Sequence, residues 1–150
     1  LPTKTQTMAA NSIMETNTPA LYVARGDVTF SLDEEISLVI IDNTDEVVVV
    51  VNVPREVARD VTQLHLSVSY SDEIAEIYLR DQFGNEITSL DKLMVICLAP
   101  GDYENEEGFC LAYYNERAEE WMCEDYSVRR APNGLFCGTT GGSLFLCLIC

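Results

Sequence analysis

Residues 46–54, EVVVVVNVP, contain five consecutive valines and follow the turn-forming residues DNTD. β-Branched side chains favour strands, and a continuous run of them indicates a strand covered on both faces. Left uncovered, such a run would aggregate with copies of itself. The stretch therefore predicts a central strand inside a β-sheet protein.

The segments on either side of this run continue the β pattern. Apolar or alternating stretches recur about every ten residues, with turn signals between them and no convincing helix. The expected strands lie at residues 21–30, 35–42, 61–70, 74–81, 92–99, 144–149 and in a hairpin within 109–125. Residues 55–60, REVARD, are expected to form one helical turn. We predict an all-β fold, an Ig-like antiparallel β-sandwich of about eight or nine strands, with residues 25–150 as one domain.

Residues 1–24 differ from the rest of the chain, because they are rich in Thr, Asn and Ala and carry little charge. We interpret them as an extended N-terminal arm that orders against a partner, the alternative being a frayed terminus. The apolar residues expected to anchor this arm are Ile13, Met14, Leu21, Tyr22 and Val23. O-linked glycans are possible on Thr3, Thr5, Thr7, Thr16 and Thr18, whereas no N-glycosylation sequence is present.

The net charge of −16 comes from 25 acidic and nine basic residues. This charge argues against nucleic acid as a partner and against charge-driven binding to anionic membranes. No apolar run approaches the roughly 18 residues of a membrane helix, so membrane insertion is not expected. Because the sequence starts at Leu1, we expect a processed product or a segment of a longer protein.

The six cysteines and the single histidine favour disulfides over a zinc site. Disulfides place the protein in an oxidising compartment, outside the cell or at its surface. Hairpin neighbours suggest the pairs Cys97–Cys110 and Cys123–Cys137, although six cysteines allow fifteen pairings.

The last strand, LFLCLI, is expected to close the sandwich between two neighbours. Cys147 and Cys150 lie on opposite faces of this strand, so a bond between them is geometrically awkward. We expect buried free thiols, the alternative being a bond from one of them to a cysteine of another chain.

Two acidic stretches are candidates for binding Ca²⁺. One contains Asp102, Glu104, Glu106 and Glu107, and the other spans residues 42–46. Neither has the spacing of an EF-hand, and the same applies to the acidic pair at 124–125. Solvated loops are the favoured interpretation, with no resident metal or other cofactor.

No motif declares a reaction. The tripeptide Arg25-Gly26-Asp27 matches an integrin-type adhesion motif, but we favour a simple turn at Gly26. His65 alternates with Leu64 and Leu66 and should face solvent, and no nucleophile is seen beside it. We therefore expect no catalytic residues and no enzyme, and Trp121 should pack on a disulfide.

A family resemblance appears in the second half of the chain. Residues 51–69 and 77–99 resemble the ZU5-type β-sandwich. Residues 109–149 resemble the GPS motif that ends GAIN-type extracellular domains of protists and algae. The matching positions are Cys110, Tyr113, Tyr114, Trp121, Cys123, Cys137, Gly138 and Thr140. The resemblance spans about residues 47–150, and it implies an extracellular sandwich whose apolar final strand closes the fold.

The chain departs from autoproteolytic members of that family. These carry a His-x-Ser/Thr tripeptide after the last Cys-Gly, whose hydroxyl attacks the preceding carbonyl. Gly142 stands here where the histidine would be, and Leu144 where the nucleophile would be. Self-cleavage by that mechanism is therefore not expected.

These observations favour a non-enzymatic extracellular structural subunit. It would self-assemble head to tail into a fibre or surface polymer, as a homo-oligomer or homopolymer, with the arm of one copy docking onto the next sandwich by strand addition. About 20 extended residues span up to ~65 Å, enough to reach a neighbour. The alternative is a stalk or adhesion module that binds a ligand, cut before the anchor of a larger cell-surface protein.

Overall fold

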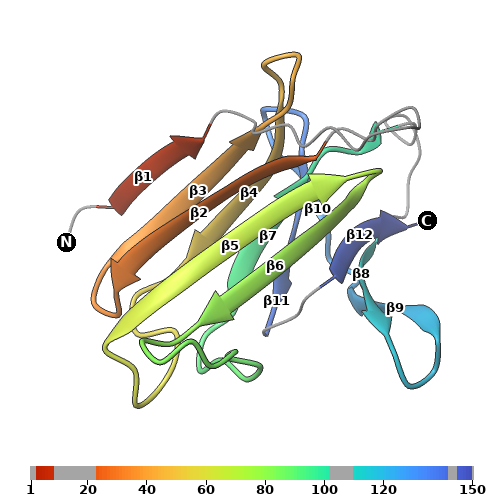
Figure 1. Cartoon of the computed structure of the whole chain (residues 1–150). Coiled ribbons are helices and arrows are strands. Elements are labelled where there is room, and N and C mark those ends of the chain that lie inside the picture. Colours follow the sequence, from red (N-terminus) through yellow and green to blue (C-terminus); the bar gives the residue numbers. More distant parts are fainter. Residues whose placement is uncertain (1–2, 9–22, 102–109, 142–144, 150) are drawn as a thin grey trace, which may run out of the picture.

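The computed structural model describes residues 3–8, 23–101, 110–141 and 145–149. They form an all-β structure of two six-stranded sheets packed face to face, which confirms the predicted β-sandwich (Figure 1). Sheet A contains, in spatial order, β1 (Thr3–Met8), β3 (Glu35–Ile41), β4 (Val47–Val53), β7 (Met94–Leu98), β11 (Phe136–Thr140) and β10 (Arg129–Arg130). Sheet B contains β2 (Ala24–Ser31), β5 (Gln63–Ser71), β6 (Ile74–Arg80), β12 (Phe145–Ile149), β8 (Cys110–Asn115) and β9 (Glu120–Asp125).

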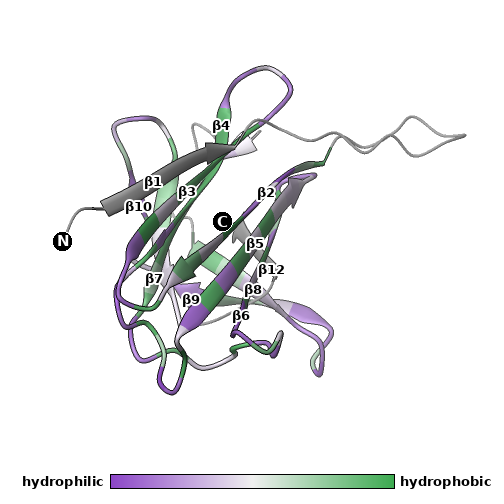
Figure 2. Ribbon diagram, turned by 60° about the vertical axis from the view of Figure 1, so that its left-hand side comes forward, coloured by the Kyte–Doolittle hydropathy of each residue, from purple (hydrophilic) through white to green (hydrophobic). Residues whose placement is uncertain are grey.

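The core lies between the sheets and is built from alternate residues of each strand. Leu38, Val51 and Ile96 form one row across sheet A, and each is 0% exposed. Leu66 and Ile77 line the facing side of sheet B. In Figure 2 the hydrophilic residues gather in the turns at the two ends of the sandwich, while the strands alternate in colour.

The valine run lies in β4, between β3 and β7, so the central position predicted for it is correct. Val49 and Val51 are fully buried in the core. Val48 is also buried, whereas Val50 on the outer side of the sheet is half-buried. One face of the strand is therefore fully covered and the other only partly.

Residues 55–60 do not form the expected helical turn but an irregular loop. Glu56 and Asp60 have φ angles of 54° and 57°, in the left-handed region that a right-handed helix excludes. Val57 and Ala58 are buried between these two residues. The backbone is tied to neighbouring segments instead of to itself: Glu56 N–H donates to the carbonyl of Leu32 at 2.8 Å.

The structure contains more strands than the sequence predicted. β1, β10 and β11 were not expected, and all three belong to sheet A. β11, FCGTT, has no alternation of large apolar residues, but it pairs along its whole length with β7. The hairpin predicted within residues 109–125 is present as β8 and β9.

The apolar C-terminal segment forms β12, which pairs antiparallel with β6 on one side and with β8 on the other. The predicted position of the closing strand between two neighbours is therefore correct. Cys147 is in register with Ala112, but its side chain and the whole of Cys150 lie outside the described residues. The expectation of free thiols at these two positions stays a prediction.

Candidate functional site

The N-terminal strand β1 occupies one edge of sheet A. It pairs with β3 in parallel, in a continuous register from Thr3 opposite Glu35 to Met8 opposite Ile40. Every other strand pair in the described part of the chain is antiparallel. Residues 3–8 of the expected arm are thus a sheet strand, attached through residues 9–22 to the rest of the sandwich.

The other predictions for the arm are only partly covered by the structure. Val23 is half-buried directly before β2. Ile13, Met14, Leu21 and Tyr22 lie outside the described residues, as do the glycosylation candidates Thr16 and Thr18. The other three candidates lie in β1: Thr3, Thr5 and Thr7.

The tripeptide Arg25-Gly26-Asp27 lies inside β2, not in a turn, so the turn expected at Gly26 is wrong. Its residues pair with Ser69, Val68 and Ser67 of β5. Gly26 is buried and follows the inward alternation of the strand. An adhesion motif presented at a loop tip is therefore not what this strand offers.

The acidic stretches supply no metal site among the described residues, in which no group of three or more metal-ligating side chains is found. Asp102, Glu104, Glu106 and Glu107 lie outside the described residues. In the β3–β4 turn, Asp42 Oδ1 accepts hydrogen bonds from Thr44 N–H, from Thr44 Oγ1 and from Glu46 N–H. These bonds lower the pKa of Asp42 against a raising effect of partial burial. This carboxylate closes its own turn.

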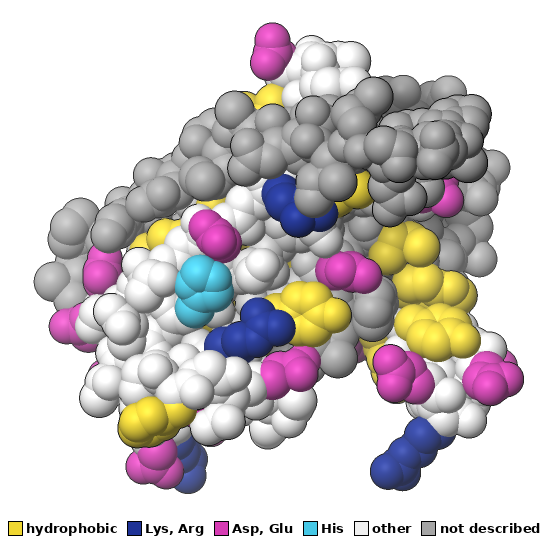
Figure 3. All heavy atoms as spheres, in the orientation of Figure 1, with side chains coloured by type: hydrophobic (Ala, Val, Ile, Leu, Met, Phe, Trp, Pro, Cys, Tyr) yellow, Lys and Arg dark blue, Asp and Glu magenta, His cyan; other side chains and the backbone are white. Residues whose placement is uncertain are grey.

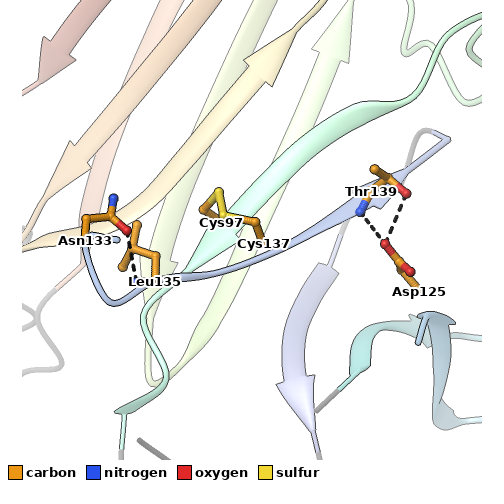
Figure 4. The surroundings of a disulfide bond; sticks show 6 residues. All are labelled: Cys97, Asp125, Asn133, Leu135, Cys137 and Thr139. Atoms are coloured by element: carbon orange, nitrogen blue, oxygen red, sulfur yellow. Dashed lines mark hydrogen bonds between the residues drawn. A yellow bond between two sulfur atoms is a disulfide. The ribbon is translucent and has the colours of Figure 1, made fainter. Parts of the chain in front are cut away.

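The two disulfides of the described residues join Cys97 to Cys137 and Cys110 to Cys123. The four cysteines expected to form disulfides do so, but the expected pairs, Cys97–Cys110 and Cys123–Cys137, are wrong, because each cysteine bonds a partner within its own sheet. β7 and β11 are neighbours in sheet A, and Cys97 lies directly opposite Cys137 (Figure 4). Cys110 and Cys123 belong to the β8–β9 hairpin of sheet B.

Around the second disulfide lies a small apolar cluster. Buried Cys110 and Ala112 contact Ile74, Trp121 and Cys123. This contact agrees with the predicted packing of Trp121 on a disulfide. The Trp121 ring also meets the ring of Tyr114 edge to face, with centroids 5.4 Å apart.

One end of the sandwich is strongly acidic. Tyr70, at the end of β5, lies near Asp42, Asp72 and Glu73. Burial raises the pKa of its phenol to about 12, and the negative charges of Glu73, Asp42 and Asp72 add to the effect. This end therefore disfavours further negative charge.

His65 faces outward from β5, as predicted, with a side chain 38% exposed. Its Nδ1 lies 2.8 Å from Thr29 Oγ1, and its Nε2 lies 3.7 Å from Asp27 Oδ2. On the other side of His65 lies Arg80, its register partner on β6. The sequence predicted the exposure of His65, but not that these side chains from three strands meet.

Comparison of the chain with protein-family models, with curated proteins and with solved structures finds no match. Within the described parts of the chain, no helix has the length and apolar character needed to cross a membrane.

Proposed function

We propose that the chain is a non-enzymatic structural subunit, working outside the cell, that assembles head to tail through exchange of β1. In the assembly, residues 3–8 of one copy would pair with β3 of the next copy, in the register seen here. The observation that carries the proposal is the parallel pairing of a terminal strand at a sheet edge.

The pairing of β1 depends little on which copy supplies the strand. Its sequence, TKTQTM, contains one large apolar residue, and its backbone pairs with β3 along the whole strand. Ladder hydrogen bonds are the same within a chain and between chains, which is the basis of strand addition. The fourteen residues 9–22 can reach at most about 50 Å, so a neighbouring edge is within range.

Two other features support an extracellular setting. The disulfides Cys97–Cys137 and Cys110–Cys123 are compatible with an oxidising compartment. We also propose that the C-terminal half is GPS-like, which is supported by the place of the apolar closing strand β12 between β6 and β8.

A heterologous contact of β1 with β3 leaves one free β1 and one free β3 in each oligomer, so growth continues.

Cysteine cross-linking tests this proposal directly. Thr5 lies opposite Ser37, so a chain carrying Thr5→Cys is mixed with a chain carrying Ser37→Cys under mild oxidation. Strand exchange predicts a disulfide between the two chains, seen on a non-reducing gel and mapped by mass spectrometry. A chain carrying Asn43→Cys, in the exposed β3–β4 turn, serves as the control and should not cross-link.

Truncation tests the assembly itself. Removing residues 1–22 stops short of Ala24, which is 1% exposed in β2 and belongs to the core. We expect filaments from the intact chain in negative-stain images and folded monomers from the truncated chain. Polymers that persist after truncation would disprove the role of β1. A cross-link found only within a doubly substituted chain would show that β1 stays on its own sandwich.

A further inference from the structure

The outer face of sheet B carries a cavity that the proposed assembly does not use. Its volume is about 300 Å³, at the lower end of the range for small-molecule sites. Most of its lining side chains are polar and come from three strands and the β6–β7 loop: Thr29, Gln63, His65, Arg80, Asp81 and Gln82. Figure 3 shows this face, with the one histidine in cyan and a basic side chain in dark blue beside it.

Arg80 is the cation of this cavity. Its guanidinium lies over the ring of Tyr78, 5.0 Å from the ring centroid. Although the chain has 25 acidic residues, none among those described forms an ion pair with Arg80. The neighbouring Asp81 uses Oδ1 to accept hydrogen bonds from Phe83 N–H and Asn85 N–H, which closes its own turn. This contact holds the guanidinium against the Tyr78 ring, and no carboxylate of the described residues forms an ion pair with it.

The remaining polar side chains carry amide, hydroxyl and imidazole groups that form hydrogen bonds. Gln63 is exposed at the start of β5. Gln82 uses Oε1 to accept from Thr62 N–H at 3.3 Å, so its amide NH₂ group remains as a donor. Thr29 Oγ1 and His65 Nδ1 are hydrogen-bonded to each other, and His65 Nε2 lies 3.7 Å from Asp27 Oδ2. Such a set suits a ligand with several hydroxyl groups.

The two kinds of group define the ligand chemistry. A planar guanidinium binds a carboxylate with two parallel hydrogen bonds. The amides, hydroxyl and imidazole around it bind ring hydroxyls. The net charge of −16 disfavours a polyanion. A single carboxylate would face Arg80, while Asp81, the acidic side chain of the lining, already accepts two backbone N–H groups.

We propose that this cavity binds a sugar acid, a single hexuronate unit. The carboxylate lies on Arg80, and the ring hydroxyls contact Gln63, Gln82 and the Thr29–His65 pair. The site is independent of strand exchange, because β1 and β3 belong to sheet A.

The test compares two ligands that differ in one group, glucuronate and glucose, by titration into the ¹⁵N-labelled intact chain. We expect glucuronate to shift the amides of β5 and β6 and to bind about tenfold or more tightly than glucose, which lacks the carboxylate. Acetate is titrated as well. If acetate binds as tightly as glucuronate, the hydroxyl contacts are absent and the proposal of a sugar site is wrong.

Variants assign the binding to Arg80. Arg80→Gln should weaken glucuronate binding about tenfold, and Arg80→Lys should weaken it less, because a point charge replaces the fork. Arg117→Gln, in the exposed β8–β9 turn, makes the same charge change elsewhere and should leave the affinity unchanged. Equal losses in Arg80→Gln and Arg117→Gln would show a general charge effect and overturn the site. Unchanged affinity in a folded Arg80→Lys and Arg80→Gln pair would overturn it too.

Discussion

Asp125 of β9 accepts two hydrogen bonds from Thr139 of β11, through Oδ2, from the backbone N–H at 2.8 Å and from Oγ1 at 3.2 Å (Figure 4). β9 is the edge strand of sheet B and β11 belongs to sheet A, so this single carboxylate joins the two layers. Its other oxygen accepts from Ser127 N–H at 2.7 Å. A buried glycine, Gly138, makes the approach possible, since a Cβ there would lie 3.2 Å from Asp125 Oδ2.

Asp125→Asn should destabilise the fold at neutral pH by about 1 kcal/mol, because an amide replaces the carboxylate as acceptor at a partly exposed position. The hydrogen bonds from Ser127 and Thr139 lower the pKa of Asp125 against the opposing effect of partial burial. A depressed folded-state pKa means that the stabilisation is present above the ordinary value of 3.8 and is lost as the pH falls below it. Urea unfolding at pH 7 and at pH 3 measures this. The difference between the parent chain and the variant should shrink at the lower pH.

The exposed hairpin residue Glu116 provides the control for that experiment. Glu116→Gln makes the same charge change without a hydrogen bond to lose, and it should alter the free energy of unfolding little at either pH. A loss in Glu116→Gln equal to that in Asp125→Asn would assign the effect to net charge instead of to the Thr139 contact.

The two disulfides should differ in their contribution to stability. Cys97 and Cys137 are 40 residues apart and Cys110 and Cys123 are 13 apart. The loop-entropy relation gives about 4 kcal/mol for the longer loop and about 3 kcal/mol for the shorter one. Paired Cys→Ala variants, compared by urea unfolding, should therefore rank in this order. The opposite order would mean that the packing lost from the apolar cluster around Trp121 outweighs the difference in loop entropy.

Among the tyrosines that the structure describes, Tyr70 should be the last to ionise, because its pKa is raised to about 12. A raised folded-state pKa means that its contribution to stability is complete below about pH 10 and is lost as the pH rises towards 12. Ultraviolet titration of the parent chain minus that of Tyr70→Phe isolates this group. Glu73→Gln removes one of the negative charges and should lower the pKa of Tyr70, whereas an unchanged value would rule out Glu73 as a cause of the raised pKa.

Most of the strands could be predicted from the sequence, because the pattern of apolar residues along each strand indicates which residues are buried. The valine run of β4 and the alternation in β5 report burial directly, so these strands could be predicted. β11 could not be found in this way, since Phe136, Gly138 and Thr140 are buried but share no apolar character that a pattern would reveal.

Pairings between distant segments were harder to predict for a different reason. Sequence neighbours suggested Cys97–Cys110, but the chain changes sheets between β7 and β8, and no residue pattern announces that crossing. The meeting of Thr29, His65 and Arg80 likewise depends on the register of β2, β5 and β6. Register is a property of the folded sheet, and the sequence states it only through the inward and outward alternation.

Two adjacent residues of β3 test that register in the remaining prediction. Leu38 is 0% exposed and points into the core, while Val39 is half-buried on the outer side opposite Val50. Leu38→Ala should cost about 2–5 kcal/mol, because it removes buried methyl groups and leaves a cavity. Val39→Ala should cost well under half as much. Urea unfolding with unchanged m-values measures both, and a larger loss at Val39 would mean that β3 is shifted by one residue, which would also invalidate the pairing of Thr5 with Ser37.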